Sequence, residues 1–208
     1  MIELKPSKAH FEKITSGPWE TIERTECRIV IDLNQKIICV TGQSSRDEDW
    51  PDNFDFRARE TAEQWFPDVK DIKVHAGFLR QYKAVRDKLL DVAYKYPNYA
   101  IRVDGFSLGA SWPQIFVQDV LYRWPERDIK AVLYAPGNPW RKLPEKYQKA
   151  LNRCIIYVRS IWDPVTWMRV LRFSRYGKNI TIGKWWRILP LQHFPGQMER
   201  NLLEKYGE

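Results

Sequence analysis

The stretch YAIRVDGFSLGAS, residues Tyr99–Ser111, decides the fold that we expect for this chain. Its first half is rich in β-forming residues up to Asp104, and a Gly-x-Ser-x-Gly pattern follows around Ser107. A strand, a sharp turn and a helix in this order hold the serine in a strained conformation, and the flanking glycines let strand and helix approach closely. The Ser107 hydroxyl is then exposed at the carboxyl end of a strand, beside N–H groups of the helix N-terminus.

The Gly-x-Ser-x-Gly pattern alone is not specific. At average Gly and Ser usage, roughly one chain in twenty of this length carries it by chance. The alternative is an ordinary strand-to-helix turn with an incidental serine. The apolar strand before Gly105 favours the functional interpretation.

The rest of the chain alternates between predicted strands and helices. Apolar runs at residues 28–33 and 36–41 flank a two-residue turn and predict a hairpin. An apolar stripe with alternating spacings of four and three residues predicts an amphipathic helix, formed by Phe78, Tyr82, Val85, Leu89, Val92 and Tyr96. Further strands are expected at residues 69–74, 99–104, 129–135 and 154–159, and helices at 7–14, 57–66, 108–124, 144–151 and 197–206. This order predicts one α/β domain over residues 1–208, with residues 1–26 as an N-terminal cap segment and a largely parallel sheet behind the hairpin.

The chain is basic and rich in aromatic residues. It has 34 Lys and Arg against 26 Asp and Glu, a net charge of +8, which suits contact with an anionic surface such as phospholipid or nucleic acid. The charges are scattered along the sequence, so solubility alone is the commoner explanation. The pair Trp185-Trp186 between Lys184 and Arg187 has the composition of a lipid-interface contact, although half-buried packing is the commoner case.

The cysteines and the N-terminal sequence carry no sign of a metal site or of export. Cys27, Cys39 and Cys154 are odd in number and far apart, and none forms a C-x-x-C pair. No apolar signal core and no run of transmembrane length is visible. We therefore expect a cytoplasmic protein without metal or organic cofactor; secretion by another route and the oligomeric state stay open.

A serine nucleophile needs a base, and the base needs a carboxylate that orients it. The histidines are His10, His75 and His193. In the α/β-hydrolase arrangement the order along the chain is Ser, Asp, His, which favours His193 in a proline-flanked segment before a helix. Asp163 directly follows a predicted strand and is the candidate acid, with an ordinary Asp-Pro turn as its alternative.

These residues resemble the class 3 (fungal-type) lipase family over roughly residues 27–198. The landmarks, in chain order, are Thr41-Gly-Gln-Ser-Ser45 with Asp49-Trp50 and Asp52, Val74-His-Ala-Gly-Phe78 with Tyr82, the elbow Gly105-Phe-Ser-Leu-Gly109, Asp163-Pro-Val165, and His193 before Pro195-Gly196. The resemblance implies an α/β-hydrolase-like three-layer sandwich with a mostly parallel central sheet and an N-terminal antiparallel hairpin.

The resemblance also implies roles for individual residues. Ser107 would be the nucleophile, His193 the general base and then acid, and Asp163 the residue that orients it. The backbone N–H groups of Gln43 and Leu108 would form the oxyanion hole.

Four further positions complete the expectations from the family. Phe106, where the family has a histidine, and Trp50 are expected to contact substrate, and His75 is expected to be structural. Gln43 replaces a Thr or Ser whose hydroxyl adds a donor in the family, so the oxyanion hole is expected to be reshaped.

The leading prediction is a serine ester hydrolase acting on lipid or other carboxylic esters. Its partners would be a lipid or small ester substrate, with a possible peripheral contact to an anionic membrane surface and no specific nucleic acid. Acyl transfer or thioester hydrolysis with the same trio stays open. A lipid- or nucleic-acid-binding protein on a non-catalytic hydrolase scaffold is the alternative from another class.

Overall fold

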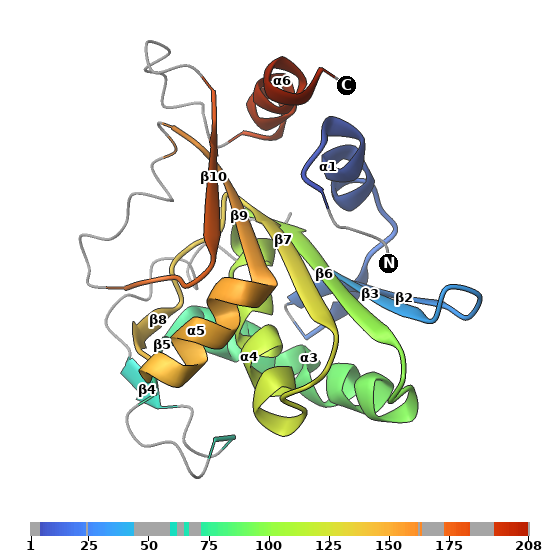
Figure 1. Ribbon diagram of the computed structural model, residues 1–208, viewed down its shortest axis with the longest axis vertical. Coiled ribbons are helices and arrows are strands. Elements are labelled where there is room, and N and C mark those ends of the chain that lie inside the picture. The colour runs from blue at the N-terminus through green and yellow to red at the C-terminus, as the bar shows by residue number, and fades with distance from the viewer. Residues whose placement is uncertain are drawn as a thin grey trace.

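The computed structural model describes residues 5–23, 25–43, 59–61, 65–66, 72–161, 163, 173–183 and 194–207. Within these ranges the chain forms an α/β structure with helices on both faces of a central sheet (Figure 1). The statements below concern these residues.

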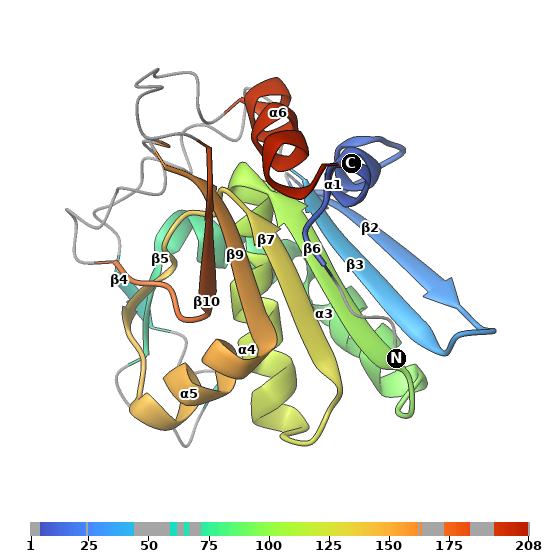
Figure 2. The ribbon, with the colours of Figure 1, turned by 45° about the horizontal axis from the view of Figure 1, so that its top comes forward.

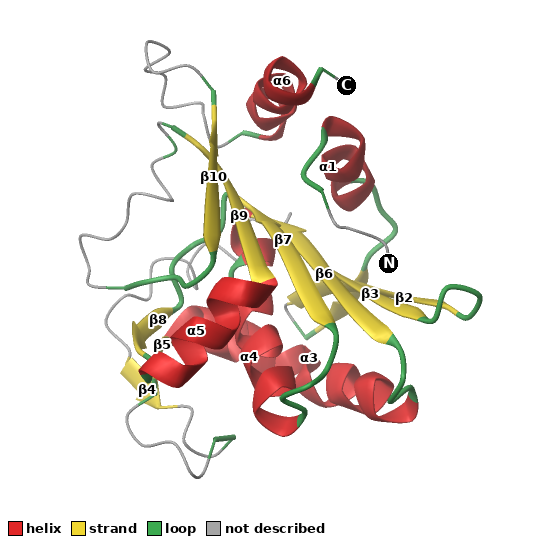
Figure 3. Cartoon of the chain, viewed as in Figure 1, coloured by secondary structure: helices red, strands yellow, loops and turns green. Residues whose placement is uncertain are grey.

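The central sheet has seven strands in the order β1-β2-β3-β6-β7-β9-β10. The strands are β1 (Glu20–Ile22), β2 (Thr25–Asp32), β3 (Ile37–Gln43), β6 (Ala100–Phe106), β7 (Ile129–Tyr134), β9 (Ile155–Ser160) and β10 (Lys178–Ile182). The first three pair antiparallel, and every pairing from β3 onward is parallel (Figure 3). The predicted mostly parallel sheet with an N-terminal hairpin is therefore confirmed.

Helices cover the two faces of this sheet in unequal groups. One face carries α3 (Ala76–Lys95), α4 (Pro113–Arg123) and α5 (Glu145–Cys154), and the other carries α1 (Lys8–Thr15) and α6 (Pro195–Tyr206), as Figure 2 shows. A separate small sheet is formed by β4 (Arg59–Thr61), β5 (Lys73–His75) and β8 (Trp140–Lys142).

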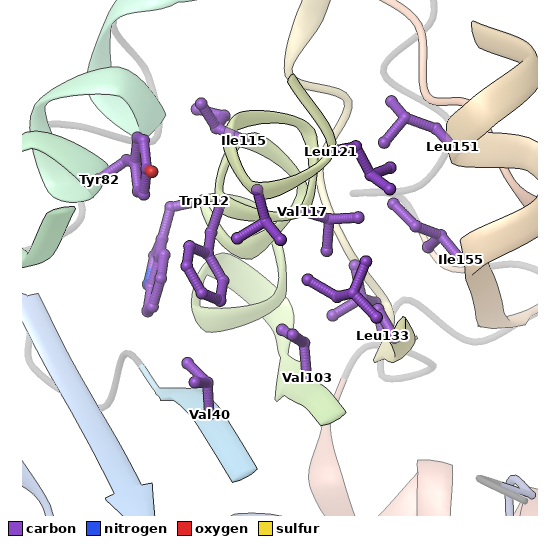
Figure 4. Close-up of a cluster of buried hydrophobic side chains, with 14 of the residues drawn as sticks. Val40, Tyr82, Val103, Trp112, Ile115, Val117, Leu121, Leu133, Leu151 and Ile155 are labelled. Carbon is purple, nitrogen blue, oxygen red and sulfur yellow. The ribbon is translucent and has the colours of Figure 1, made fainter. Parts of the chain in front are cut away.

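The side chains of β6 divide between two hydrophobic clusters because successive residues of a strand point to opposite faces. Ile101 and Val103 belong to the larger cluster under α3, α4 and α5. Phe106 belongs to the smaller cluster under α1 and α6. Figure 4 shows α4 in the larger cluster, with Tyr82 on one side and Leu151 on the other.

The predicted helices and strands agree with most of these elements. The hairpin, the stripe helix and the C-terminal helix are present as β2–β3, α3 and α6. The helix after the serine begins late, at Pro113, where a proline at the first position loses no helical hydrogen bond.

The helix expected at residues 57–66 is wrong for the part that the structure describes. Residues 59–61 form β4, whose Arg59 pairs with His75 of β5 in an antiparallel register. Arg, Glu and Ala favour a helix in isolation, but pairing with a neighbouring strand overrides such a local preference.

Candidate active site

The serine turn has the predicted strained geometry. Ser107 follows β6 directly and has φ +56°, the left-handed region that non-glycine residues seldom adopt. It begins a short 3-10 helix, Ser107–Ala110, which leads through two residues into α4. A strained backbone conformation persists only where neighbouring contacts stabilise it, and such conformations are common at functional sites.

Three glycines bring the serine turn into direct backbone contact with the end of β3. A Cβ on Gly42 would lie 2.0 Å from the carbonyl oxygen of Gly109, and a Cβ on Gly105 would lie 2.3 Å from the same oxygen. A Cβ on Gly109 would lie 2.4 Å from Cα and 2.5 Å from N of Gln43. The backbone of Gln43 therefore lies beside the turn that contains Leu108, which suits two N–H groups directed at one oxyanion.

A second serine, the buried Ser111, supports the other side of the turn through hydrogen bonds. The Ser111 hydroxyl donates to the Ser107 carbonyl oxygen at 3.1 Å and accepts from the Gly137 N–H at 2.8 Å. The Gln114 amide donates to the Gly137 carbonyl oxygen at 3.0 Å. The loop that follows β7 is thus hydrogen-bonded to the residues that follow the nucleophile candidate.

Asp163 lies at the same edge of the sheet as Ser107. Strands β6, β7 and β9 are parallel neighbours, so the residues that follow β6 and β9 come out at the same carboxyl edge. Asp163 is fully buried, and its backbone N–H donates to the Ser160 carbonyl oxygen at 3.3 Å. This placement suits an acid held against a histidine.

Two predicted site residues, Trp50 and His193, lie outside the described residues. The helix α6 begins at Pro195, two residues after His193, and its Asn201 amide donates to the Ser160 hydroxyl at 3.0 Å. The chain that follows His193 is therefore anchored to the strand that leads to Asp163.

The remaining predicted residues are buried beside the elbow. His75 is stacked on Phe78 with ring centroids 4.1 Å apart, and its backbone N–H donates to the Pro139 carbonyl oxygen at 2.9 Å. This packing agrees with a structural role for His75. Phe106, expected to contact substrate, is 8% exposed and packs edge-on against Phe11 of α1.

Sequence reasoning missed the polar residues that support the elbow. Ser111, Gln114 and Gly137 make the hydrogen bonds described above, and His10 reaches a carboxylate of β6. Most of these contacts join residues more than twenty positions apart, so no local sequence pattern predicts them. The glycine at position 137, three residues past a strand, is the one signal that a close approach was needed there.

The described residues contain no group of three or more His, Cys, Asp or Glu side chains arranged to hold a metal ion. In the described helices we find no stretch with the length and apolar character needed to cross a bilayer. The three cysteines are free thiols, and burial raises the pKa of Cys27 to about 11.

The mostly parallel sheet with helices on both faces, and the strained serine between a central strand and a helix, define an α/β-hydrolase-like fold. Residues 37–171 match the family model described as lipase (class 3). That match covers more than half of the chain, and the chain belongs to the class 3 lipase family.

Individual relatives agree with this assignment. A curated lipase from Rhizomucor miehei is 31% identical over 103 residues, which are 46% of this chain and 28% of the relative. The solved propeptide complex of Rhizomucor miehei lipase superposes with a TM-score of 0.64 at 18% identity, covering 89% of this chain and 66% of that one. A triacylglycerol lipase, described as having a catalytic centre formed by a serine protease triad, gives a TM-score of 0.61 at 20% identity, over 77% of this chain and 62% of that one. The chain thus spans less than two thirds of each relative.

Proposed function

We propose that this protein is a serine ester hydrolase that acts on lipid or other carboxylic esters through Ser107, His193 and Asp163. The observation that carries the proposal is the left-handed backbone of Ser107 at the carboxyl end of β6, in a turn whose Gly109 lies against the backbone of Gln43. Membership of the class 3 lipase family supports the substrate class. The serine protease triad described for a similar triacylglycerol lipase supports the trio.

In the proposed reaction, the Ser107 hydroxyl attacks the ester carbonyl carbon while His193 takes its proton. The tetrahedral oxyanion accepts hydrogen bonds from the backbone N–H groups of Gln43 and Leu108, and loss of one such donor typically costs about 3 kcal/mol of transition-state stabilisation. His193 then gives the proton to the leaving alcohol. Water, activated by the same imidazole, releases the acid from Ser107, and Asp163 holds the histidine in the correct tautomer throughout.

A serine-directed fluorophosphonate probe tests the nucleophile. We expect it to label the wild-type protein and the Ser16→Ala variant, since Ser16 is an exposed residue of the α1 cap, and to leave Ser107→Ala unlabelled. Hydrolysis of short p-nitrophenyl esters should follow the same pattern. A folded wild type that takes up no probe would instead favour a non-catalytic binding protein.

The same labelling and ester-hydrolysis assays test whether Asp163 orients the histidine. Asp163→Asn should keep the fold and lower kcat by about four powers of ten, because an asparagine there favours the wrong histidine tautomer. Asp87→Asn is the matched control, since the Asp87 side chain is 92% exposed. Near-normal turnover in Asp163→Asn would show that another carboxylate orients the base.

The substrate class is then resolved by comparing p-nitrophenyl esters, phospholipids in anionic vesicles and acyl thioesters. We expect the oxygen esters to be hydrolysed fastest. The net charge of +8 supports stronger binding to anionic than to neutral vesicles, weakening as salt is added. If thioesters were hydrolysed as fast as oxygen esters, the protein would be better described as a thioesterase with the same three residues.

A further inference from the structure

Helix α1 packs against the end of β6 that leads into the serine turn, on the face of the sheet opposite α3 and α4 (Figure 2). Phe11 of α1 is fully buried, and its ring packs edge-on against two rings, 5.2 Å from Phe106 and 5.0 Å from Tyr134 between centroids. Phe106 and Tyr134 are partners in the β6–β7 register. One side chain of α1 therefore touches the last residue of two adjacent strands.

Both of those last residues directly precede a strained backbone position. Ser107 follows Phe106 and has φ +56°, and Ala135 follows Tyr134 and has φ +48°. Neither residue is a glycine, so each position carries a steric cost that neighbouring contacts must offset. The Phe11 ring lies against the residue just before each of them.

His10, the residue before Phe11 in α1, makes polar contacts with the same two strands. The His10 Nε2 atom lies 3.3 Å from an Asp104 carboxylate oxygen, and its Nδ1 atom lies 2.9 Å from the Tyr134 hydroxyl. A backbone hydrogen bond from Ser7 reaches the same hydroxyl. With a proton on Nε2, His10 donates to the Asp104 carboxylate, and its other ring nitrogen meets the tyrosine hydroxyl.

Asp104 depends on this contact. It is a buried carboxylate three residues before Ser107, and its Oδ1 atom has no hydrogen-bond partner among the described residues. A buried carboxylate with too few donors is costly and tends to move toward water. Removal of the His10 ring would therefore disturb β6 just upstream of the nucleophile.

We propose that α1 is a positioning element for catalysis, in which His10 and Phe11 hold Asp104 and Phe106 so that Ser107 keeps its reactive geometry. This inference rests on the proposed function. The close approach of Gly109 to the end of β3 and the hydrogen bonds of Ser111 hold the turn from one face of the sheet, and α1 holds it from the other. His10 and Phe11 touch no reacting atom, so they act through the backbone of β6.

The rate constant and the final extent of Ser107 labelling by a fluorophosphonate separate positioning from stability. A variant that is only less stable but still mostly folded is labelled at nearly the wild-type rate, and one that is irreversibly lost to aggregation reaches a lower final extent. A mispositioned serine is instead labelled completely but slowly. We expect His10→Ala to label to the wild-type extent with a rate constant at least about 10-fold lower, since small misplacements in an active site are this costly. For a soluble p-nitrophenyl ester, kcat should fall similarly while KM stays within about two-fold.

Two variants complete the experiment. His10→Gln retains an N–H donor for Asp104 and should recover most of the rate. Ile14→Ala is the matched control, because Ile14 is buried in the same helix and cluster but has no polar atom for Asp104 or Tyr134. It should lower the melting temperature and leave the labelling rate constant within about two-fold of wild type, because surviving folded molecules keep their site geometry.

Wild-type labelling rates in His10→Ala, or equal slowing in Ile14→Ala, would overturn the specific positioning role of His10 and Phe11 and leave the proposed function intact. Failure of the folded wild type to label would overturn both. If His10→Ala does not fold, Phe11→Leu takes its place, since it keeps an apolar side chain but loses the ring contacts. A normal rate constant in Phe11→Leu would then count against the proposal.

Discussion

At Gly109 the difference between a hydrogen atom and a methyl group decides whether the serine turn can form. A Cβ there would lie 2.4 Å from Cα of Gln43, and the obstacle is backbone that cannot rotate away. We expect Gly109→Ala to lower the free energy of unfolding by about 3 kcal/mol or more and to abolish labelling of Ser107. Urea denaturation and fluorophosphonate labelling measure the two effects.

Gly196 is the matched control for this substitution. It lies in the first turn of α6, and a Cβ there would meet nothing within 4 Å. Because alanine is the better helix former, Gly196→Ala should be neutral or stabilising by up to about 1 kcal/mol. Equal effects of the two substitutions would contradict the close approach of the serine turn to β3.

At the scale of single elements, the sequence predicted the helices and strands whose residue pattern is visible within the element itself. The stripe from Phe78 to Tyr96 lies on α3, and the hairpin follows from two apolar runs around a short turn. The strands β1, β4 and β8 have only three residues each, too few to show an alternation. They exist because of their partners in the sheets, and a single sequence does not reveal such pairings.

Asn201 makes a buried side-chain hydrogen bond between α6 and strand β9 of the central sheet. It is 1% exposed, donates to the Ser160 hydroxyl at 3.0 Å and accepts from the Gln197 amide at 3.0 Å. Asn201→Ala leaves the buried Ser160 hydroxyl without this donor, so we expect a loss of about 2 kcal/mol in urea denaturation. Arg200→Ala, on the exposed side of the same helix, should change stability by less than about 0.5 kcal/mol. A result within that range for Asn201→Ala would show that the hydrogen bond to Ser160 adds little to the docking of α6, which also has its apolar contacts and the contact of Lys205 with Thr181.

At the scale of the whole molecule, the sequence predicted the order of the candidate site residues but not how they are supported. Gln43, Ser107 and Asp163 each end or follow a strand, and parallel strands bring such residues to one edge. The contact of His10 with Asp104 spans 94 positions and depends on how α1 crosses the sheet, so no spacing rule contains it. His193 lies outside the described residues, and its role stays a prediction.

Burial of weak acids across the whole core makes the fold sensitive to alkali. Burial raises the pKa of the Cys27 thiol from 9.0 to about 11, and it also raises the pKa values of Tyr82, Tyr134 and Tyr157. In the unfolded chain these groups lose their protons at lower pH than in the folded protein. Their contribution to stability is therefore complete below about pH 9 and is lost as the pH rises further.

Urea denaturation at pH 7, 9 and 11 measures this loss. We expect the free energy of unfolding to fall between pH 9 and 11, with Cys27 contributing on the order of 2 kcal/mol because its pKa is raised by about two units. Cys27→Ala is less stable at pH 7, since Cys27 is fully buried, but it lacks this titrating group. Its stability, measured relative to its own value at pH 7, should therefore fall less steeply than that of the wild type. The same fall in both proteins would show that the Cys27 thiol ionises as readily in the folded protein as in the unfolded chain.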